Sequence, residues 1–140
     1  MLRDENDNFL GPNPNAFSRR ETESYLSVTW CEYFQGQDNQ QLRCAIEAIR
    51  NSALNVKSKA CFCVAETPVV LAEVAKTHPK ARALYLPVAD NDAHAGIYEI
   101  EPTDTLLLAK LADELWCDYY TKDSADELPM DACLKSSSVK

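Results

Sequence analysis

The sequence predicts an α/β or α+β fold, in which a small mixed sheet holds about four strands and three helices. Short apolar segments alternate with segments of helical periodicity, in the order β-α-β-α-β-β-α. The connections in the middle of the chain are short, and 46% of the 140 residues are hydrophobic, enough for one core. We therefore expect a single globular domain at 21–121, between an irregular lead-in at 1–20 and a frayed polar tail at 122–140.

Residues 26–34 form the first predicted strand, and they begin a strand–turn–helix unit that we expect to be the nucleus of the fold. Their β-branched and aromatic side chains suit a pleated surface. Strict alternation places Leu26, Val28 and Trp30 on the face expected to pack on the following helix. In that helix Asp38 is the predicted N-cap residue, with a capping box closed by the glutamine three residues later.

The middle of the chain has sharp element boundaries. Residues 60–65 are apolar throughout and predict a central strand covered on both faces. Thr67 is the predicted N-cap of a helix that opens with Pro68, and Pro79 stops that helix. Residues 81–88 predict the third strand.

The fourth strand, at 95–100, follows a turn at 90–92 and is expected to form an antiparallel hairpin with the third. Pro102 marks the predicted start of the last helix, which is expected to run to about Tyr120. The strand–helix–strand order earlier in the chain favours parallel pairing there.

The charge of the chain bears on its partners. The formal net charge is −8 and the isoelectric point is about 4.7. Such a field repels phosphate backbones, so direct nucleic-acid binding is disfavoured, and it favours encounter with a basic protein partner. No apolar run approaches a membrane span, and the first residues are acidic where a signal peptide would be basic. We place the protein in the cytoplasm.

Six cysteines are present, and we expect thiols in a reducing compartment, most of them in the core. There is no CxxC pair. Cys61 and Cys63 would share a face of a strand, which leaves a zinc site as the alternative. The chain has three glycines and lacks the phosphate-binding and hydrolase motifs, so no cofactor is predicted.

The candidate catalytic residues are His94, Asp92 and Ser27. Asp90, Asp92 and His94 would share a face of an extended segment, where they could bind a divalent metal or form an acid-oriented base. A polar hairpin turn explains the same residues without a site. A nucleophile paired with His94 could be Ser27 or one of the thiols at positions 61 and 63, if the fold brings them together.

The candidate binding residues are Trp30, Glu32 and Tyr33. Two aromatic rings beside a carboxylate could form a recognition patch, and the same rings could equally be core. His78, in the last turn of its predicted helix, is expected to be a histidine stabilised by the helix end.

Three short segments carry a resemblance: Asn15-Ala16-Phe17, Tyr25-Leu26-Ser27-Val28 and Asp92-Ala93-His94-Ala95. With them the chain resembles short bacterial or phage proteins that share an F…LSV segment and a late xHA segment. The resemblance implies a bacterial or phage origin and draws attention to Ser27 and His94, but it implies no activity.

Two hypotheses on function follow. The first is a non-enzymatic module that acts through a protein partner, as an accessory, immunity or antitoxin-like subunit, because a negative field accompanies the lack of catalytic motifs. The second is a small hydrolase or transferase built around His94 with Asp90, Asp92 or Glu32. The direction in which the His94 ring points distinguishes them.

Overall fold

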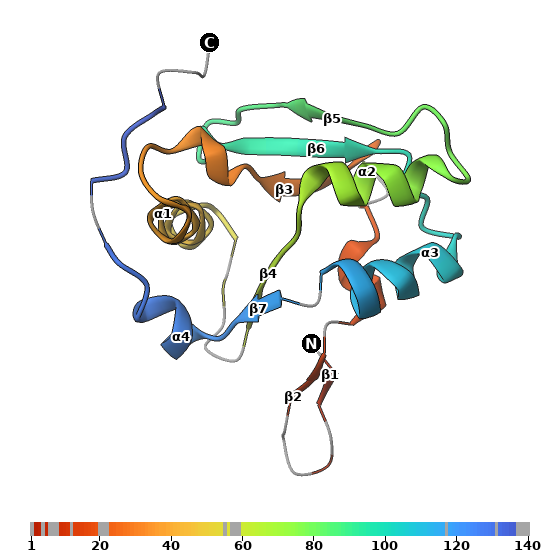
Figure 1. Cartoon of the computed structure of the whole chain (residues 1–140), viewed down its shortest axis with the longest axis horizontal. Helices are drawn as coiled ribbons and strands as arrows, with labels where there is room; N and C mark the ends of the chain where they lie inside the picture. The colour runs from red at the N-terminus through yellow and green to blue at the C-terminus, as the bar shows by residue number, and fades with distance from the viewer. Residues whose placement is uncertain are drawn as a thin grey trace. The chain divides into compact units, whose positions relative to one another are not determined.

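The computed structural model describes residues 2–3, 5, 9–11, 13–19, 23–54, 56, 60–116, 118–130 and 132–136. It contains helices and strands together, as predicted (Figure 1). In chain order the elements are β1 (Leu2–Arg3), β2 (Phe9–Gly11), η1 (Pro14–Phe17), β3 (Tyr25–Thr29), η2 (Cys31–Tyr33), α1 (Asp38–Arg50), β4 (Phe62–Val64), α2 (Thr67–Ala75), β5 (Arg82–Tyr85), β6 (His94–Tyr98), α3 (Thr105–Lys110), η3 (Leu111–Leu115), β7 (Asp118–Tyr120) and α4 (Lys122–Asp126). The run from β3 to α3 follows the predicted order, and β1, β2, β7 and α4 are additional.

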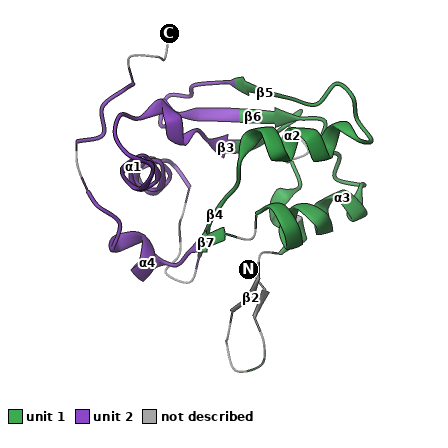
Figure 2. Cartoon of the chain, in the orientation of Figure 1, with its two compact units in different colours: residues 1–27, 61–84, 96–119 green, residues 28–60, 85–95, 120–140 purple. Residues whose placement is uncertain are grey.

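The chain divides into two compact units, each built from separate stretches of sequence (Figure 2). The first unit comprises 1–27, 61–84 and 96–119, and the second comprises 28–60, 85–95 and 120–140. The core of each unit therefore depends on contacts between segments that are far apart in the chain. The domain limits predicted from composition, at residues 20 and 121, stay predictions.

The three-stranded sheet has the order β3-β6-β5, and two-stranded sheets pair β1 with β2 and β4 with β7. At one end of β3 the ring of Tyr25 lies 5.6 Å from the ring of Tyr98. Just beyond its other end, the backbone N–H of Trp30 donates to Ala93 O at 2.9 Å. Residue numbers thus run in opposite directions along β3 and β6, so these strands are antiparallel.

The predicted parallel pairing of the first two strands, and the central place of 60–65, are wrong. The central strand is β6, which buries Ala95, Gly96 and Ile97 in succession. In β4, Phe62 is the one buried residue, and its pairing partner is β7. Both segments are locally apolar, so composition does not distinguish β6, which lies between β3 and β5, from β4, which pairs with β7.

The first strand ends at Thr29, five residues before its predicted end. Tyr33 N–H donates to Trp30 O at 3.3 Å and Phe34 N–H donates to Cys31 O at 3.2 Å, which closes the 3-10 turn η2. Because the turn replaces alternation, neighbouring residues Tyr33 and Phe34 are both buried.

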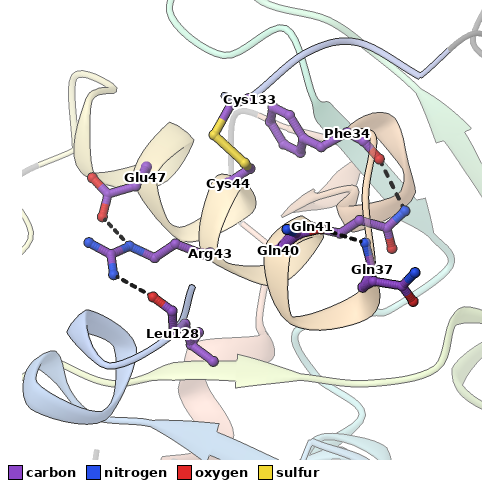
Figure 3. The surroundings of a disulfide bond; sticks show 9 residues. All are labelled: Phe34, Gln37, Gln40, Gln41, Arg43, Cys44, Glu47, Leu128 and Cys133. Carbon is purple, nitrogen blue, oxygen red and sulfur yellow. Dashed lines mark hydrogen bonds and ion pairs between the residues drawn. A yellow bond between two sulfur atoms is a disulfide. The ribbon is translucent and has the colours of Figure 1, made fainter. Parts of the chain in front are cut away.

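The N-cap of α1 lies one residue before the predicted position. Gln37 is the N-cap residue, and its N–H donates to Gln40 Oε1 at 2.9 Å, so Asp38 and Gln41 do not have these roles. Gly36 has φ +112°, and a Cβ there would lie 2.5 Å from Gln40 Oε1. This turn therefore requires glycine. The Gln41 side chain instead donates to Phe34 O at 3.0 Å (Figure 3).

In the first unit, the π-helical turn η3 interrupts the predicted last helix after Lys110. Phe17 and Trp116, from opposite ends of this unit's sequence, stack at 4.9 Å between ring centroids. The Asp104 side chain caps α3 by accepting from Leu107 N–H at 3.1 Å. Its other oxygen lies 3.4 Å from His78 Nε2, so His78 contacts the cap of a neighbouring helix in this unit.

The tail at 122–140, predicted to be frayed, contains the helix α4, and contacts with α1 hold this helix in place. The Arg43 guanidinium donates from Nη1 to the carbonyl oxygens of Ala125, Asp126 and Leu128 at 3.1, 2.9 and 3.1 Å. Its Nε also donates to Glu47 at 3.0 Å. Carbonyls at a helix end have no partner within the helix, so Arg43 supplies donors that α4 lacks. Residues 137–140 lie outside the described residues.

A disulfide joins Cys44 of α1 to Cys133, across 89 positions of sequence (Figure 3). The expectation of thiols at these two positions is therefore wrong. Burial raises the pKa of both Cys31 and Cys63 to about 11, with smaller contributions from neighbouring negative groups. Both remain protonated thiols near neutral pH. Cys117 lies outside the described residues.

The Arg43 contacts predict a difference between two arginine-to-lysine substitutions. The Arg43 guanidinium uses two nitrogens, Nε toward Glu47 and Nη1 toward the carbonyls, and the single ammonium of Arg43→Lys cannot reach both sets of partners, so this variant should lower the free energy of unfolding by about 1–3 kcal/mol. Arg50→Lys is the matched control, because Arg50 binds carboxylates of Glu47 and Asp126, which an ammonium can also pair. Urea denaturation measures both. Equal losses for the two variants would show that the carbonyl contacts of Arg43 contribute little.

Candidate functional site

His94 points toward the backbone of the neighbouring strand. Its Nδ1 lies 2.7 Å from Leu86 O, and because a carbonyl can only accept, Nδ1 is the donor. The same two residues also pair through their main chains, because Leu86 N–H donates to His94 O at 3.0 Å. The half-buried imidazole thus closes the hairpin of β5 and β6. This geometry matches the polar-turn interpretation of the segment.

The two carboxylates of the turn make separate contacts. Asp90 Oδ2 accepts from Ala53 N–H at 2.7 Å. Asp92 is exposed, and its main-chain oxygen accepts from the Tyr85 hydroxyl at 2.8 Å. Within the described part of the chain, no three His, Cys, Asp or Glu side chains gather to hold a metal ion, and this includes Asp90, Asp92 and His94.

Ser27, the third catalytic candidate, lies on β3 in the first unit, whereas His94 lies in the second. Its exposed hydroxyl donates to Glu23 Oε2 at 3.4 Å. Cys63 is also in the first unit, and its raised pKa makes it a weak nucleophile near neutral pH. A nucleophile paired with His94 stays a prediction.

Asn91, which the sequence indicated only as a turn residue, is buried at the centre of the hairpin turn, with 9% of its surface exposed. Its Nδ2 donates to Thr29 Oγ1 at 3.0 Å, and its Oδ1 accepts from Ala93 N–H at 3.1 Å. Its main chain bonds Val88 in both directions at 3.1 Å. Asn91 therefore fixes the turn against the residue at which β3 ends.

The turn and η2 bring four aromatic rings together in the second unit, an aromatic cluster of Trp30, Tyr33, Phe34 and Tyr85. Centroid distances are 5.8 Å from Trp30 to Tyr85, 6.1 Å from Tyr33 to Tyr85 and 5.0 Å from Tyr33 to Phe34. Tyr33 and Phe34 are buried at 8% and 7% exposure, and Tyr85 reaches the surface at 36%. The candidate binding residues Trp30 and Tyr33 are thus in contact with a ring that the sequence did not single out.

Exposed carboxylates lie next to this cluster. Burial raises the pKa of Tyr33, and the negative charge of Asp92 raises it further. The pKa of the neighbouring Cys31 thiol is raised mainly by burial, and the negative charge of the exposed Glu32 raises it further. Trp30, Glu32, Tyr33, Tyr85 and Asp92 together form what we call the aromatic–acidic surface.

Comparisons of the sequence with models of protein families, with curated proteins and with solved structures find no match. Among the described helices, none has the length and apolar character to cross a bilayer. What the protein does is therefore inferred from the geometry of its own residues.

The electrostatics of the aromatic–acidic surface predict paired changes of pKa. Asp92→Asn should lower the pKa of Tyr33, because one negative charge that opposes tyrosinate is removed, while burial keeps the pKa above its ordinary value. Glu32→Gln should leave Tyr33 unchanged and instead lower the pKa of Cys31 from about 11.

NMR titration of the Tyr33 ring carbon and the pH dependence of Cys31 alkylation measure the two groups. If Asp92→Asn left the pKa of Tyr33 where it was, the carboxylate would lie too far away to belong to this surface.

Proposed function

We propose that the protein acts by binding a basic protein partner through its aromatic–acidic surface, as an accessory, immunity or antitoxin-like subunit. The observation that carries the proposal is the packing of Trp30, Tyr33 and Tyr85 beside the exposed carboxylates Glu32 and Asp92.

The chemistry of these residues suits protein recognition. Tyrosine and tryptophan are enriched among the residues that contribute most to protein interfaces, and they lose little conformational entropy on binding. Tyr85 is held in place before any partner arrives, by its hydroxyl bond to Asp92 and by two ring contacts. A preorganised surface avoids part of the ordering cost of association.

The sign of the charge selects the partner. An arginine or lysine can stack on the face of a Tyr or Trp ring and pair with a carboxylate at the same time. Glu32 and Asp92 lie beside such rings, and the net charge of −8 would speed the approach of a basic protein. For the same reason direct nucleic-acid binding is not part of the proposal.

The alternative, a small hydrolase or transferase at His94, has less support. A general base must reach the proton that it removes, with an orienting group on its other nitrogen. In His94 the orienting contact is the Leu86 carbonyl, and the nearby carboxylate of Asp90 accepts from the Ala53 backbone. The first contact belongs to the hairpin and the second ties the turn to the residues after α1, so neither joins the imidazole to a carboxylate.

A bacterial or phage origin and a cytoplasmic location belong to the same proposal. In that compartment cellular thiols can reduce the Cys44–Cys133 disulfide, so the bond would form and break with the redox state of the cell. In an oxidising compartment it would be a permanent one.

Selection from random peptides displayed on phage, with the immobilised protein as bait in both its oxidised and its reduced form, tests the proposal. We expect enrichment of peptides that combine Arg or Lys with an aromatic residue, with binding that weakens as salt is added. Tyr85→Ser should weaken the selected peptides about tenfold, since one ring of a preformed contact is lost.

Tyr119→Ser and Asp113→Asn are the matched controls, because both residues are exposed and lie in the first unit. They should bind like the unchanged protein. No enrichment at low salt, or an equal loss in Tyr119→Ser, would contradict the proposed surface.

A further inference from the structure

The C-terminal residues 134–136, which we call the strap, lie along the backbone of residues 33–35 in the second unit. Gln35 N–H donates to Leu134 O at 2.9 Å, and Ser136 N–H donates to Tyr33 O at 2.7 Å. Between these two bonds Phe34 and Lys135 form an antiparallel β-bridge. The Gln35 side chain adds a bond from Nε2 to Lys135 O at 2.9 Å. The strap thus occupies a short strand edge.

The side chains of the strap are mostly in solvent. Leu134 is 56% exposed and Lys135 is exposed. Apolar burial therefore contributes little to holding these two residues, and exposed main-chain bonds are individually weak. The disulfide at Cys133, directly before the strap, is the covalent constraint that keeps it near Phe34 (Figure 3).

The edge under the strap has the geometry of a strand-docking site. Tyr33 O and Gln35 N–H are two residues apart and bond the same chain, as in an antiparallel ladder. An extended peptide that supplies one donor and one acceptor at this spacing could take the place of the strap. Tyr33 also belongs to the aromatic–acidic surface, so this edge is continuous with it.

The strap itself indicates what the occupant should be. It is extended and carries a lysine opposite Phe34. The carboxylates of Glu32 and Asp38 act on the nearby Cys31, so a positive charge in this region is favoured. These properties are those of the basic partner inferred above.

We propose that the Cys44–Cys133 disulfide is a redox latch: reduction by a dithiol releases the strap and frees the edge at residues 33–35 for an extended basic segment of the partner. This proposal rests on the proposed function and adds its regulation. It also assigns residues 134–136 the role of an internal occupant of the partner's site.

The reduction is balanced by the dithiol. Cys133 is exposed and Cys44 is 3% exposed, so a thiolate of the reductant attacks the Cys133 sulfur. The bond between the protein sulfurs breaks, Cys44 leaves as a thiolate and takes up a proton, and a mixed disulfide forms at Cys133. The second thiol of the reductant then displaces Cys133, which is also protonated. The protein gains two electrons and two protons, and the dithiol becomes a disulfide.

Amide hydrogen exchange on the full chain tests the latch without any partner. Reduction with dithiothreitol should lower the protection of Gln35 N–H at least about tenfold, while the amides of α1 and of its C-cap residue Asn51, which donates to Glu47 O, keep theirs. Cys133→Ser should show the same loss without reductant. Cys63→Ser, which lies in the other unit, should respond to the reductant as the unchanged chain does.

Two results would overturn the latch: unchanged protection of Gln35 after mass spectrometry shows an open disulfide, or an equal loss of protection throughout α1. The second would mean that the bond holds the whole unit together. If Cys133→Ser does not fold, Ser136→Pro removes the donor to Tyr33 O with the disulfide intact, and should itself lower the protection of Gln35.

A synthetic peptide of residues 132–136, with serine at position 133, is the probe for the freed edge. It should bind the reduced chain and restore protection of Gln35, and should not bind the oxidised chain. Equal binding to both forms would contradict the proposal. Failure of the phage selection on the aromatic–acidic surface would leave the exchange result standing, so the two proposals can fail separately.

Discussion

The second unit depends on one buried amide. The Asn91 side chain donates to Thr29 and accepts from Ala93, so both of its polar atoms are paired away from water. Leaving a buried polar group without a partner costs about 1–3 kcal/mol, so the turn holds this arrangement firmly. Because the turn is fixed against the end of β3, Trp30 N–H meets Ala93 O and η2 follows immediately. The aromatic cluster is a consequence of that register.

The C-terminal part of the chain folds although it is polar, because contacts with α1 stabilise it. Arg43 supplies donors to the end of α4, and Cys44, the next residue, supplies the disulfide. Two adjacent residues of one helix thus secure two successive parts of the tail. Composition alone predicts fraying, since it records how little apolar surface residues 122–136 have of their own. It cannot record partners that lie about eighty positions away.

The sequence predicted what local interactions determine and missed what distant ones determine. The order of the elements from β3 to α3 follows from apolar periodicity and from breakers such as Pro68. The N-caps of α1 and α2, Gln37 and Glu66, each lie one residue before the predicted position, within the usual uncertainty of helix ends. The pairing of β3 with β6 rather than β4, the disulfide and the burial of Asn91 each depend on which distant segment arrives, and no pattern within a window of residues encodes that.

The candidate residues show the same division. Trp30 and Tyr33 were found because an aromatic pair beside a carboxylate is visible locally, but Tyr85 was not, since its place in the cluster depends on the hairpin. His94 was singled out as a chemical group, and the hairpin uses that group to bind Leu86. Arg43 and Arg50 of this unit are paired with carboxylates of α1 and α4. Beside the aromatic cluster lie the exposed carboxylates of Glu32 and Asp92 together with the exposed Lys135 of the strap, so the charge that a partner meets there depends on the strap.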